Sequence, residues 1–291
     1  MSLNLKQLEA FVWVSDLASF GQAAERLGTT QPNISARIAK LEESLGVTLM
    51  LRDAGSVRLT PQGQKLIGYA REVLSAVDQL ITVSGQRGLY DGTLRLGVTE
   101  LVSLTWLRPF LRAMKDAFPN LLVEVTVGMS IELERALAGR QLDLALQNAP
   151  FARAMSGEVF LGEYPLVWVA HPDLDVADTL ENVPVLTHGR ETVLYQEIAA
   201  HFAGRTAIAP RLVPSSNLFS CLQMVQDGLG VAALPAAMVP PGLRVLPYAW
   251  TPAPLTFFAR YDAERAIDPV VAAGKLASEI AMQSIKSNNS T

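Results

Sequence analysis

Cysteine is nearly absent from this sequence, which holds 1 such residue, Cys221. A lone thiol excludes an internal disulfide and a cysteine-rich metal cage, and its place on an apolar helix face predicts a core residue. Histidine is scarce too, with 3 residues, none of them in a zinc-protease, nucleophile-elbow or P-loop motif. We therefore expect no catalytic residue, no metal and no cofactor, and do not expect an enzyme.

Long apolar runs are also missing. The first residues are interrupted by Lys6 and Glu9, whereas a secretory signal needs an unbroken apolar core. No later stretch is long and apolar enough to span a bilayer. The sequence thus predicts a cytoplasmic protein without membrane contact.

Apolar residues, by contrast, make up 49% of the 291 positions, enough for more than one buried core. The net charge of -4 is low for a nucleic-acid binder, but the acid excess lies after residue 60. Before that point the basic residues Lys6, Arg26, Arg37, Lys40, Arg52 and Arg58 balance Glu9, Asp16, Glu25, Glu42, Glu43 and Asp53. The early part can therefore still present a basic face, with modest affinity for each subunit.

Residues 19–45 carry the pattern of two short helices joined by a tight turn. Ser19 and Gln22 form a capping-box pattern, Gly28 suits the end of the first helix, and Thr30 can cap the second. In the second helix Ile34, Ile38, Leu41 and Leu45 form one narrow inward stripe. The small and polar residues facing away from that stripe suit the major groove of DNA.

A helix-turn-helix pattern alone also fits an ordinary helical hairpin, so the flanking sequence decides. An apolar helix face precedes it at residues 5–17, and two strand-like runs, 47–51 and 57–59, follow. These features predict a winged helix-turn-helix whose wing carries Arg52 and Arg58 beside the phosphate backbone or minor groove. The expected DNA-contacting residues are Thr30, Gln31, Pro32, Asn33, Ser35, Arg37, Lys40, Arg52 and Arg58.

Many positions of this first part match one family. They are Leu5, Leu8, Phe11, Ser19, Phe20, Ala23, Ala24, Leu27, Gln31, Pro32, Ser35, Ile38, Leu41, Glu42, Leu45, Gly46, Leu49, Arg52, Leu59, Thr60 and Gly63. The chain thereby resembles the LysR-type transcriptional regulators, departing mildly at Thr30, where serine is usual, and at Met50, where phenylalanine is usual. The resemblance implies a sequence-specific regulator that binds double-stranded promoter DNA at an interrupted dyad and responds to a small-molecule effector. RNA polymerase is a further candidate partner.

Residues 61–84 predict one long helix, with a first apolar row at Leu66, Ala70, Val73, Val77 and Leu80 and a second at Ile67, Leu74 and Ile81. Two apolar rows favour a self-pairing coiled coil; the alternative is packing on its own domain. The resemblance implies that this linker helix dimerises the chain, with a homotetramer as the full assembly. Turn formers in residues 85–92 then predict a hinge.

The remainder alternates strands and helices. Strands are expected at 94–98, 121–127, 142–146, 185–187, 212–213, 231–234 and 255–260, and helices at 104–118, 130–137, 192–202, 218–226 and 269–285. This alternation predicts α/β architecture with a parallel sheet covered on both faces. The resemblance implies a two-lobed, periplasmic-binding-protein-like (type II) effector domain, crossing near residues 159–170 into the second lobe. The expected domains are therefore 1–60, the linker 61–91 and 92–291.

Ligands of open α/β sheets sit beyond the C-terminal strand ends, at helix N-termini. The expected effector-binding residues there are Thr99, Glu100, Gly128, Met129, Ser130, Gln147, Asn148, Thr187, His188, Ser215 and Ser216. Hydroxyls and backbone N–H groups favour a small anion, above all a carboxylate metabolite. Any single Ser or Thr could equally be a helix cap, and Glu100 would repel an anion unless paired with His188 or Arg190.

Two other protein classes fit less well. A solute-binding protein would match the second half, but the missing signal peptide and the first ninety-odd residues oppose it. An enzyme would need a catalytic constellation that the sequence does not contain, and a disulfide redox switch would need a second cysteine.

Overall fold

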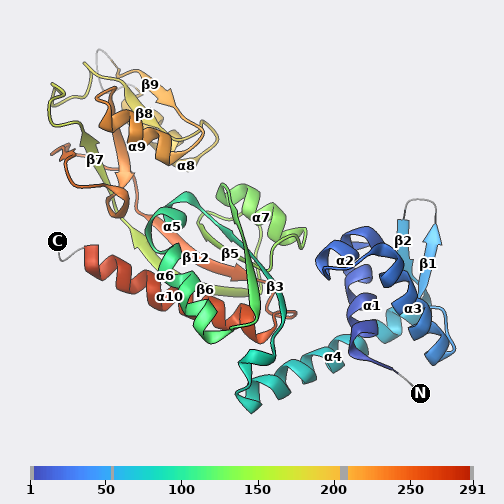
Figure 1. Ribbon diagram of the computed structural model, residues 1–291. Helices are drawn as coiled ribbons and strands as arrows, with labels where there is room; N and C mark the ends of the chain where they lie inside the picture. Colours follow the sequence, from blue (N-terminus) through green and yellow to red (C-terminus); the bar gives the residue numbers. More distant parts are fainter. Residues whose placement is uncertain (1–2, 54–55, 204–208, 289–291) are drawn as a thin grey trace.

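The computed structural model describes residues 3–53, 56–203 and 209–288. A small helical unit, a long helix and two α/β lobes follow one another along the chain (Figure 1). No helix among the described residues is long and apolar enough to cross a membrane.

The first unit is a winged helix-turn-helix, as the sequence predicts. It consists of α1 (Leu5–Leu17), α2 (Phe20–Arg26), α3 (Gln31–Leu45), β1 (Met50–Asp53) and β2 (Ser56–Leu59), the two strands pairing antiparallel. β1 begins three residues later than expected, because Glu42 Oε1 accepts hydrogen bonds from the backbone N–H groups of Leu49 (2.7 Å) and Met50 (3.1 Å). The apolar faces of all three helices meet in one core.

The linker helix α4 (Pro61–Ser84) has the bounds that the sequence predicts. Part of its apolar rows packs within its own chain. Leu66, Ile67 and Ala70 pack into the core of the winged unit, so the alternative of packing on its own domain holds for this part of the helix. The short helix η1 (Arg87–Leu89) occupies the expected hinge.

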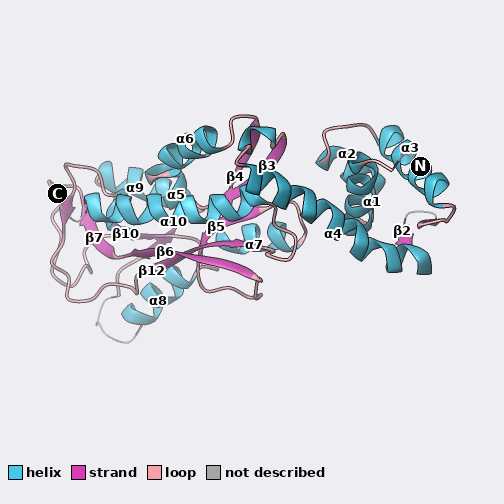
Figure 2. Cartoon of the chain, turned by 90° about the horizontal axis from the view of Figure 1, so that it is seen from below, coloured by secondary structure: helices cyan, strands magenta, loops and turns pink. Residues whose placement is uncertain are grey.

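Lobe I contains a five-stranded sheet of order β4-β3-β5-β12-β6. Its elements are β3 (Gly92–Val98), α5 (Glu100–Thr105), α6 (Leu107–Ala117), β4 (Leu121–Val127), α7 (Ser130–Ala138), β5 (Leu144–Asn148), β6 (Gly157–Tyr164), β12 (Leu255–Tyr261) and α10 (Asp268–Asn288). Figure 2 shows α10 lying along this lobe, and its contacts with β6 and α6 agree.

The structure corrects two expectations in lobe I. The helix expected at 104–118 is divided at Trp106, because Pro109 has no N–H to donate to the carbonyl four residues back and its ring crowds that carbonyl. The sheet is mixed, since β12 runs antiparallel to both β5 and β6. The chain leaves lobe I where β6 ends, so β12, returning from lobe II, enters the sheet from that side and runs the opposite way.

Lobe II has a second five-stranded sheet of order β11-β7-β10-β8-β9. Its elements are β7 (Leu166–Ala170), β8 (Val185–Thr187), α8 (Val193–Phe202), β9 (Leu212–Pro214), α9 (Leu218–Gln226), β10 (Val231–Pro235), η2 (Ala236–Met238) and β11 (Arg244–Val245). β8, β9 and β10 run parallel, whereas β7 is antiparallel to β10, so this sheet is mixed as well. The expected two-lobed α/β architecture is present.

Candidate nucleic-acid interface and lobe junction

The first turn of α3 is an exposed polar helix end of the winged unit. Gln31, Pro32 and Asn33 are exposed, while Ile34 and Ile38 on the opposite side are fully buried. Thr30 takes the extended N-cap conformation, but its side chain makes no capping hydrogen bond, so that expectation is wrong. The polar tip is therefore held by the apolar stripe beneath it and remains accessible.

The capping box expected at Ser19 is only half formed. Ser19 Oγ accepts from the Gln22 backbone N–H at 3.3 Å. A complete capping box lies instead at the start of α1, where Asn4 and Gln7 exchange hydrogen bonds of 3.0 and 3.1 Å. This fixes the N-terminal end of α1 beside the recognition helix.

A basic surface hollow adjoins that helix. It measures about 360 Å³ and is lined by Asn4, Lys6, Gln7, Asn33, Ala36, Arg37 and Lys40. Lys40 is exposed and Arg37 is half-buried. Sequence reasoning missed Lys6 as part of this surface; the Asn-x-x-Gln capping pattern before α1 was the available signal. Ser35 is half-buried in the next turn of α3.

The two wing arginines lie on different strands of the wing. Arg58 is exposed on β2. Arg52 lies on β1 opposite Val57, and its side chain is outside the described part of the structure.

At the junction of the lobes, Glu100 reaches across from α5 to lobe II. Its Oε2 accepts a hydrogen bond from the backbone N–H of Leu218, in the first turn of α9, at 2.7 Å. The expected partners His188 and Arg190 are not needed for this contact, since Arg190 instead donates to the Tyr195 hydroxyl at 3.1 Å. The carboxylate of Glu100 thus occupies a helix N-terminus that could otherwise bind an anion.

Two buried hydroxyls lie on the elements that meet here: Thr99 precedes Glu100, and Thr187 ends β8, which contacts α9. Thr99 and Thr187 are 8% and 3% exposed, and the hydroxyl of each has no hydrogen-bond partner among the described residues. The Thr187 carbonyl oxygen accepts from Ser215 N at 2.8 Å and from Cys221 Sγ at 3.3 Å. The structure therefore brings Thr187, Ser215 and Cys221 together in lobe II, with Glu100 linked to the same helix α9. His188 is half-buried and Ser216 exposed, each next in sequence to one of these residues.

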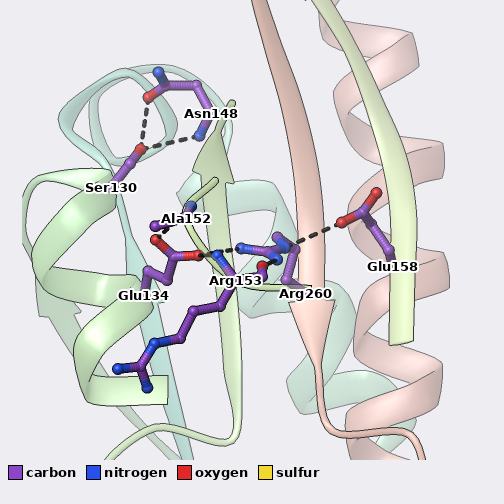
Figure 3. A network of polar contacts seen from close by, with 7 residues as sticks. All are labelled: Ser130, Glu134, Asn148, Ala152, Arg153, Glu158 and Arg260. Atoms are coloured by element: carbon purple, nitrogen blue, oxygen red, sulfur yellow. Dashed lines mark hydrogen bonds and ion pairs between the residues drawn. The ribbon is translucent and has the colours of Figure 1, made fainter. Parts of the chain in front are cut away.

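The remaining expected effector residues are bonded to one another. Ser130 Oγ donates to Asn148 Oδ1 at 2.8 Å and accepts from Asn148 N at 3.1 Å, as Figure 3 shows. The amide of Gln147, turned so that its nitrogen faces Ser130, donates to the Ser130 carbonyl at 3.0 Å and accepts from Arg260 Nη1 at 3.1 Å. Met129 is the N-cap of α7, and Gly128 N donates to the Val98 carbonyl at 3.1 Å.

Below these residues lies a buried charge that sequence reasoning missed. Arg260, 1% exposed, donates to Glu134 at 3.3 Å, to Glu158 at 3.1 Å and to the Arg153 carbonyl (Figure 3). Burial alone would raise the pKa of Glu134, but hydrogen bonds from the Arg153 and Ala152 backbone and from Arg260 lower it. This network fixes the segment after β5 and, through Gln147, the first turn of α7.

The chain matches two known domain families. The model of the LysR substrate binding domain matches residues 87–274, and that of the bacterial regulatory helix-turn-helix protein, lysR family, matches residues 5–64. A relative named "Probable hydrogen peroxide-inducible genes activator" from Streptomyces viridosporus is 31% identical, with 81% of this chain and 78% of the relative covered. The transcriptional regulator DgdR of Burkholderia cepacia is 28% identical over 84% of this chain and 82% of its own.

Solved structures agree on the fold. A mutant of OxyR from Corynebacterium glutamicum superimposes with a TM-score of 0.60 at 23% identity, covering all of this chain (100%) and 96% of that one. The matched domains account for both the winged unit and the two lobes. The chain belongs to the LysR family of bacterial transcriptional regulators, DNA-binding proteins with a C-terminal effector-binding domain.

Proposed function

We propose that this regulator reads operator DNA with the first turns of α3 and holds the phosphate backbone with the basic residues around it. The observation that carries this assignment is the exposure of Gln31, Pro32 and Asn33 above a fully buried apolar stripe, next to a hollow containing Lys6, Arg37 and Lys40. An amide at the groove suits an adenine edge, whereas exposed cations suit phosphate. Thr30, Ser35, Arg52 and Arg58 complete the proposed surface.

Replacing one residue proposed to read the groove and one proposed to bind phosphate tests this division of roles. Gln31→Ala should mainly erode preference among sequences, while Arg58→Ala should weaken binding to all duplexes alike and reduce the salt slope by about one. Fluorescence anisotropy with a duplex selected from a random pool, and with a scrambled duplex, measures both at several salt concentrations. Uniform weakening by Gln31→Ala, or loss of sequence preference in Arg58→Ala, would contradict these roles.

For the effector we propose a small carboxylate metabolite at the lobe junction. Glu100 itself supplies the supporting observation, because a carboxylate from this chain already binds the α9 N-terminus at 2.7 Å. An effector carboxylate would take over that position while Thr99, Thr187 and Ser215 offer hydroxyls. Displacing Glu100 would replace its hydrogen bond to Leu218, which joins the two lobes, with hydrogen bonds to the ligand. Effector binding would therefore alter how the lobes are held together.

A thermal-shift screen of small carboxylates, sugar acids and uncharged analogues tests this proposal, since a ligand of the folded state raises the melting temperature. Glu100→Gln should keep an acceptor for Leu218 N but remove the competing charge, tightening carboxylate binding by roughly tenfold. Glu163→Gln, an exposed carboxyl of β6, is the matched control. Stabilisation by uncharged compounds alone, or weaker carboxylate binding in Glu100→Gln, would reject the anion assignment.

Peroxide sensing does not carry over from the relatives' names. Cys221 is fully buried, and desolvation raises the pKa of its thiol to about 11, with the Ser215 hydrogen bond opposing and Glu100 adding to this shift. The thiolate, which is the reactive form, is therefore rare at neutral pH. With 1 cysteine in the chain, no partner exists for an internal disulfide.

We further propose that the chain works in the cytoplasm as a homotetramer, a dimer of dimers joined by α4. Two winged units on one dimer would match an interrupted dyad in promoter DNA, and pairing would compensate for the modest charge of each. RNA polymerase remains the proposed partner in transcription.

A further inference from the structure

One carboxylate joins the winged unit to lobe I. Asp16, near the end of α1, is 6% exposed at its side chain and pairs with Arg71 of α4 at 2.5 Å, Arg140 at 2.7 Å and Arg265 at 2.9 Å. Arg140 follows α7 and Arg265 precedes α10, so both belong to lobe I. Desolvation lowers the pKa of Arg265, Asp16 opposes that shift, Arg140 and Arg71 add to it, and Asp262, which pairs with Arg265 at 3.6 Å, opposes it as well. Asp16 is therefore the anion that the three guanidinium groups share.

A second ion pair joins the same parts with the charges exchanged. Arg26, in the last turn of α2, pairs with Asp143 of lobe I, and its guanidinium lies 4.4 Å from the ring centre of Trp13. The other oxygen of Asp143 accepts from Arg95 N at 2.8 Å. Arg95 Nη2 in turn donates to the Glu25 carbonyl at 3.2 Å, at the end of α2.

These contacts are polar, and the buried apolar residues of the two sides form separate clusters. The buried core of the winged unit and the buried cores of the lobes have no member in common among the described residues. An interface held by ion pairs rather than by a shared core can separate without unfolding either side. Its stability also depends on ionic strength, since salt screens charges that lie at a partly exposed boundary.

The position of this interface links it to the lobe junction. Arg140 and Asp143 lie in the turn between α7 and β5, whereas Ser130 begins α7 and Asn148 ends β5. The same two elements therefore carry docking residues at one end and expected effector residues at the other. A rigid helix and strand transmit displacement of one end to the other.

We propose that Asp16 and Arg26, with their lobe I partners, form a latch that fixes the orientation of the winged helix-turn-helix on its own lobe I. The exposed tip of α3 is left free by the latch, so docking sets where the tip points rather than whether it is accessible. Coupling to an effector rests on the proposed function; the docking itself does not.

Hydrogen exchange on the full-length protein tests the docking. Asp16→Asn keeps the shape of the side chain but removes the anion that joins the arginines of α4 and lobe I, so peptides covering residues 17–26 and 139–143 should exchange roughly tenfold faster than in the wild type. In the wild type, added sodium chloride should produce the same change.

Arg140→Met, which alters only the lobe I side, is the second variant should Asp16→Asn lose its fold by circular dichroism. Glu43→Gln removes an exposed carboxylate of the winged unit and serves as control.

DNA spacing provides the functional readout. A duplex selected by the wild type from a random pool is compared with the same duplex carrying about 5 inserted base pairs, which turns one half-site to the opposite face. The wild type should lose affinity roughly tenfold on insertion and both latch variants less than about threefold, because a released unit can reorient. Unchanged exchange and unchanged spacing preference in Asp16→Asn and Arg140→Met would overturn the latch. Failure of the wild type to bind any duplex would refute the DNA-reading assignment instead, while the exchange data would still decide the docking.

Discussion

Asp78 is an acidic residue half-buried on α4, between α1 and α10. Desolvation raises the pKa of its carboxyl to about 6, and repulsion from Glu9 and Asp268 adds to the shift. Asp268 itself pairs with Arg87 at 3.3 Å. Between the ordinary pKa of 3.8 and about 6, the folded chain therefore binds more protons than the unfolded chain at this site. Stability contributed here is present below that window and is lost as pH rises through it.

Asp78→Asn should consequently stabilise the protein at high pH and leave it unchanged at low pH. At pH 8 the melting temperature should rise by roughly 2 °C, less than the full shift would give because solvent screens a half-buried carboxyl. At about pH 3, below the window, wild type and variant should melt together. Differential scanning fluorimetry measures both, with the exposed Glu72→Gln on the same helix as control. Equal melting temperatures of wild type and Asp78→Asn at both pH values would show that the charged Asp78 carboxylate does not destabilise the fold.

Individual residues were predictable from sequence where the signal is local. The buried stripe of α3 follows from spacing alone, and Cys221 is buried as its apolar helix face indicates. Asp16 and Arg260 could not be assigned partners, and Glu100 bonds Leu218 rather than the suggested His188 or Arg190, because these partners lie far away in the chain. Long-range polar contacts depend on the assembled fold, which periodicity does not specify. The same limit explains why Ser130 and Asn148, expected to face a ligand, bond each other.

Among the elements, helices with clear capping and stop residues were predicted with the bounds that the structure shows. α4 begins at a proline with Thr60 as its cap and ends before Gly85, and its sequence bounds agree with the structure. α9 likewise starts after the capping residue Asn217. The division of α5 from α6 was missed although Pro109 is a local signal for it; at the break, the ring N–H of Trp106 donates to the Tyr164 hydroxyl at 2.8 Å. The direction of β12 depends on the path of the whole chain through lobe II.

Two glycines of α4 give an element-scale prediction. A Cβ on Gly63 would lie 2.2 Å from the Leu49 carbonyl oxygen, whereas one on Gly68 would meet nothing within 4 Å. Gly63→Ala should therefore push the first turn of α4 from the wing and destabilise the protein by about 1–3 kcal/mol. Gly68→Ala should stabilise it by roughly 0.5–1 kcal/mol through its better helix propensity.

Urea unfolding of both variants, monitored by helical circular dichroism, measures the difference. Each substitution adds the same methyl group to the same helix. The difference between the two variants therefore separates the clash with the Leu49 carbonyl oxygen from the gain in helix propensity. Destabilisation by Gly68→Ala equal to that by Gly63→Ala would show that the wing does not constrain α4.

On the scale of the whole molecule, α4 carries an apolar stripe that its own chain leaves uncovered. Tyr69, Val73, Leu80 and Val83 are 65%, 45%, 71% and 88% exposed, and they recur on one face of the helix. An apolar hollow of about 490 Å³, lined by Leu3, Leu5, Leu8 and Val73 together with Asn4 and Lys6, adjoins this stripe. Since Leu66 and Ala70 are used internally, the face available for pairing is displaced from the one that the sequence rows predict.

Leu80→Glu should therefore convert the proposed dimer to a monomer without unfolding it, because the charge would be placed in the pairing face and the side chain is exposed in the single chain. Gln79→Glu adds the same charge one position away at an exposed site and should leave the assembly intact. Sedimentation equilibrium gives the mass of each. Because one winged unit carries little net positive charge, the monomer should bind a selected duplex at least about a hundredfold more weakly. An unchanged mass for Leu80→Glu would place the dimer interface elsewhere, and undiminished DNA binding by a proven monomer would show that one winged unit suffices.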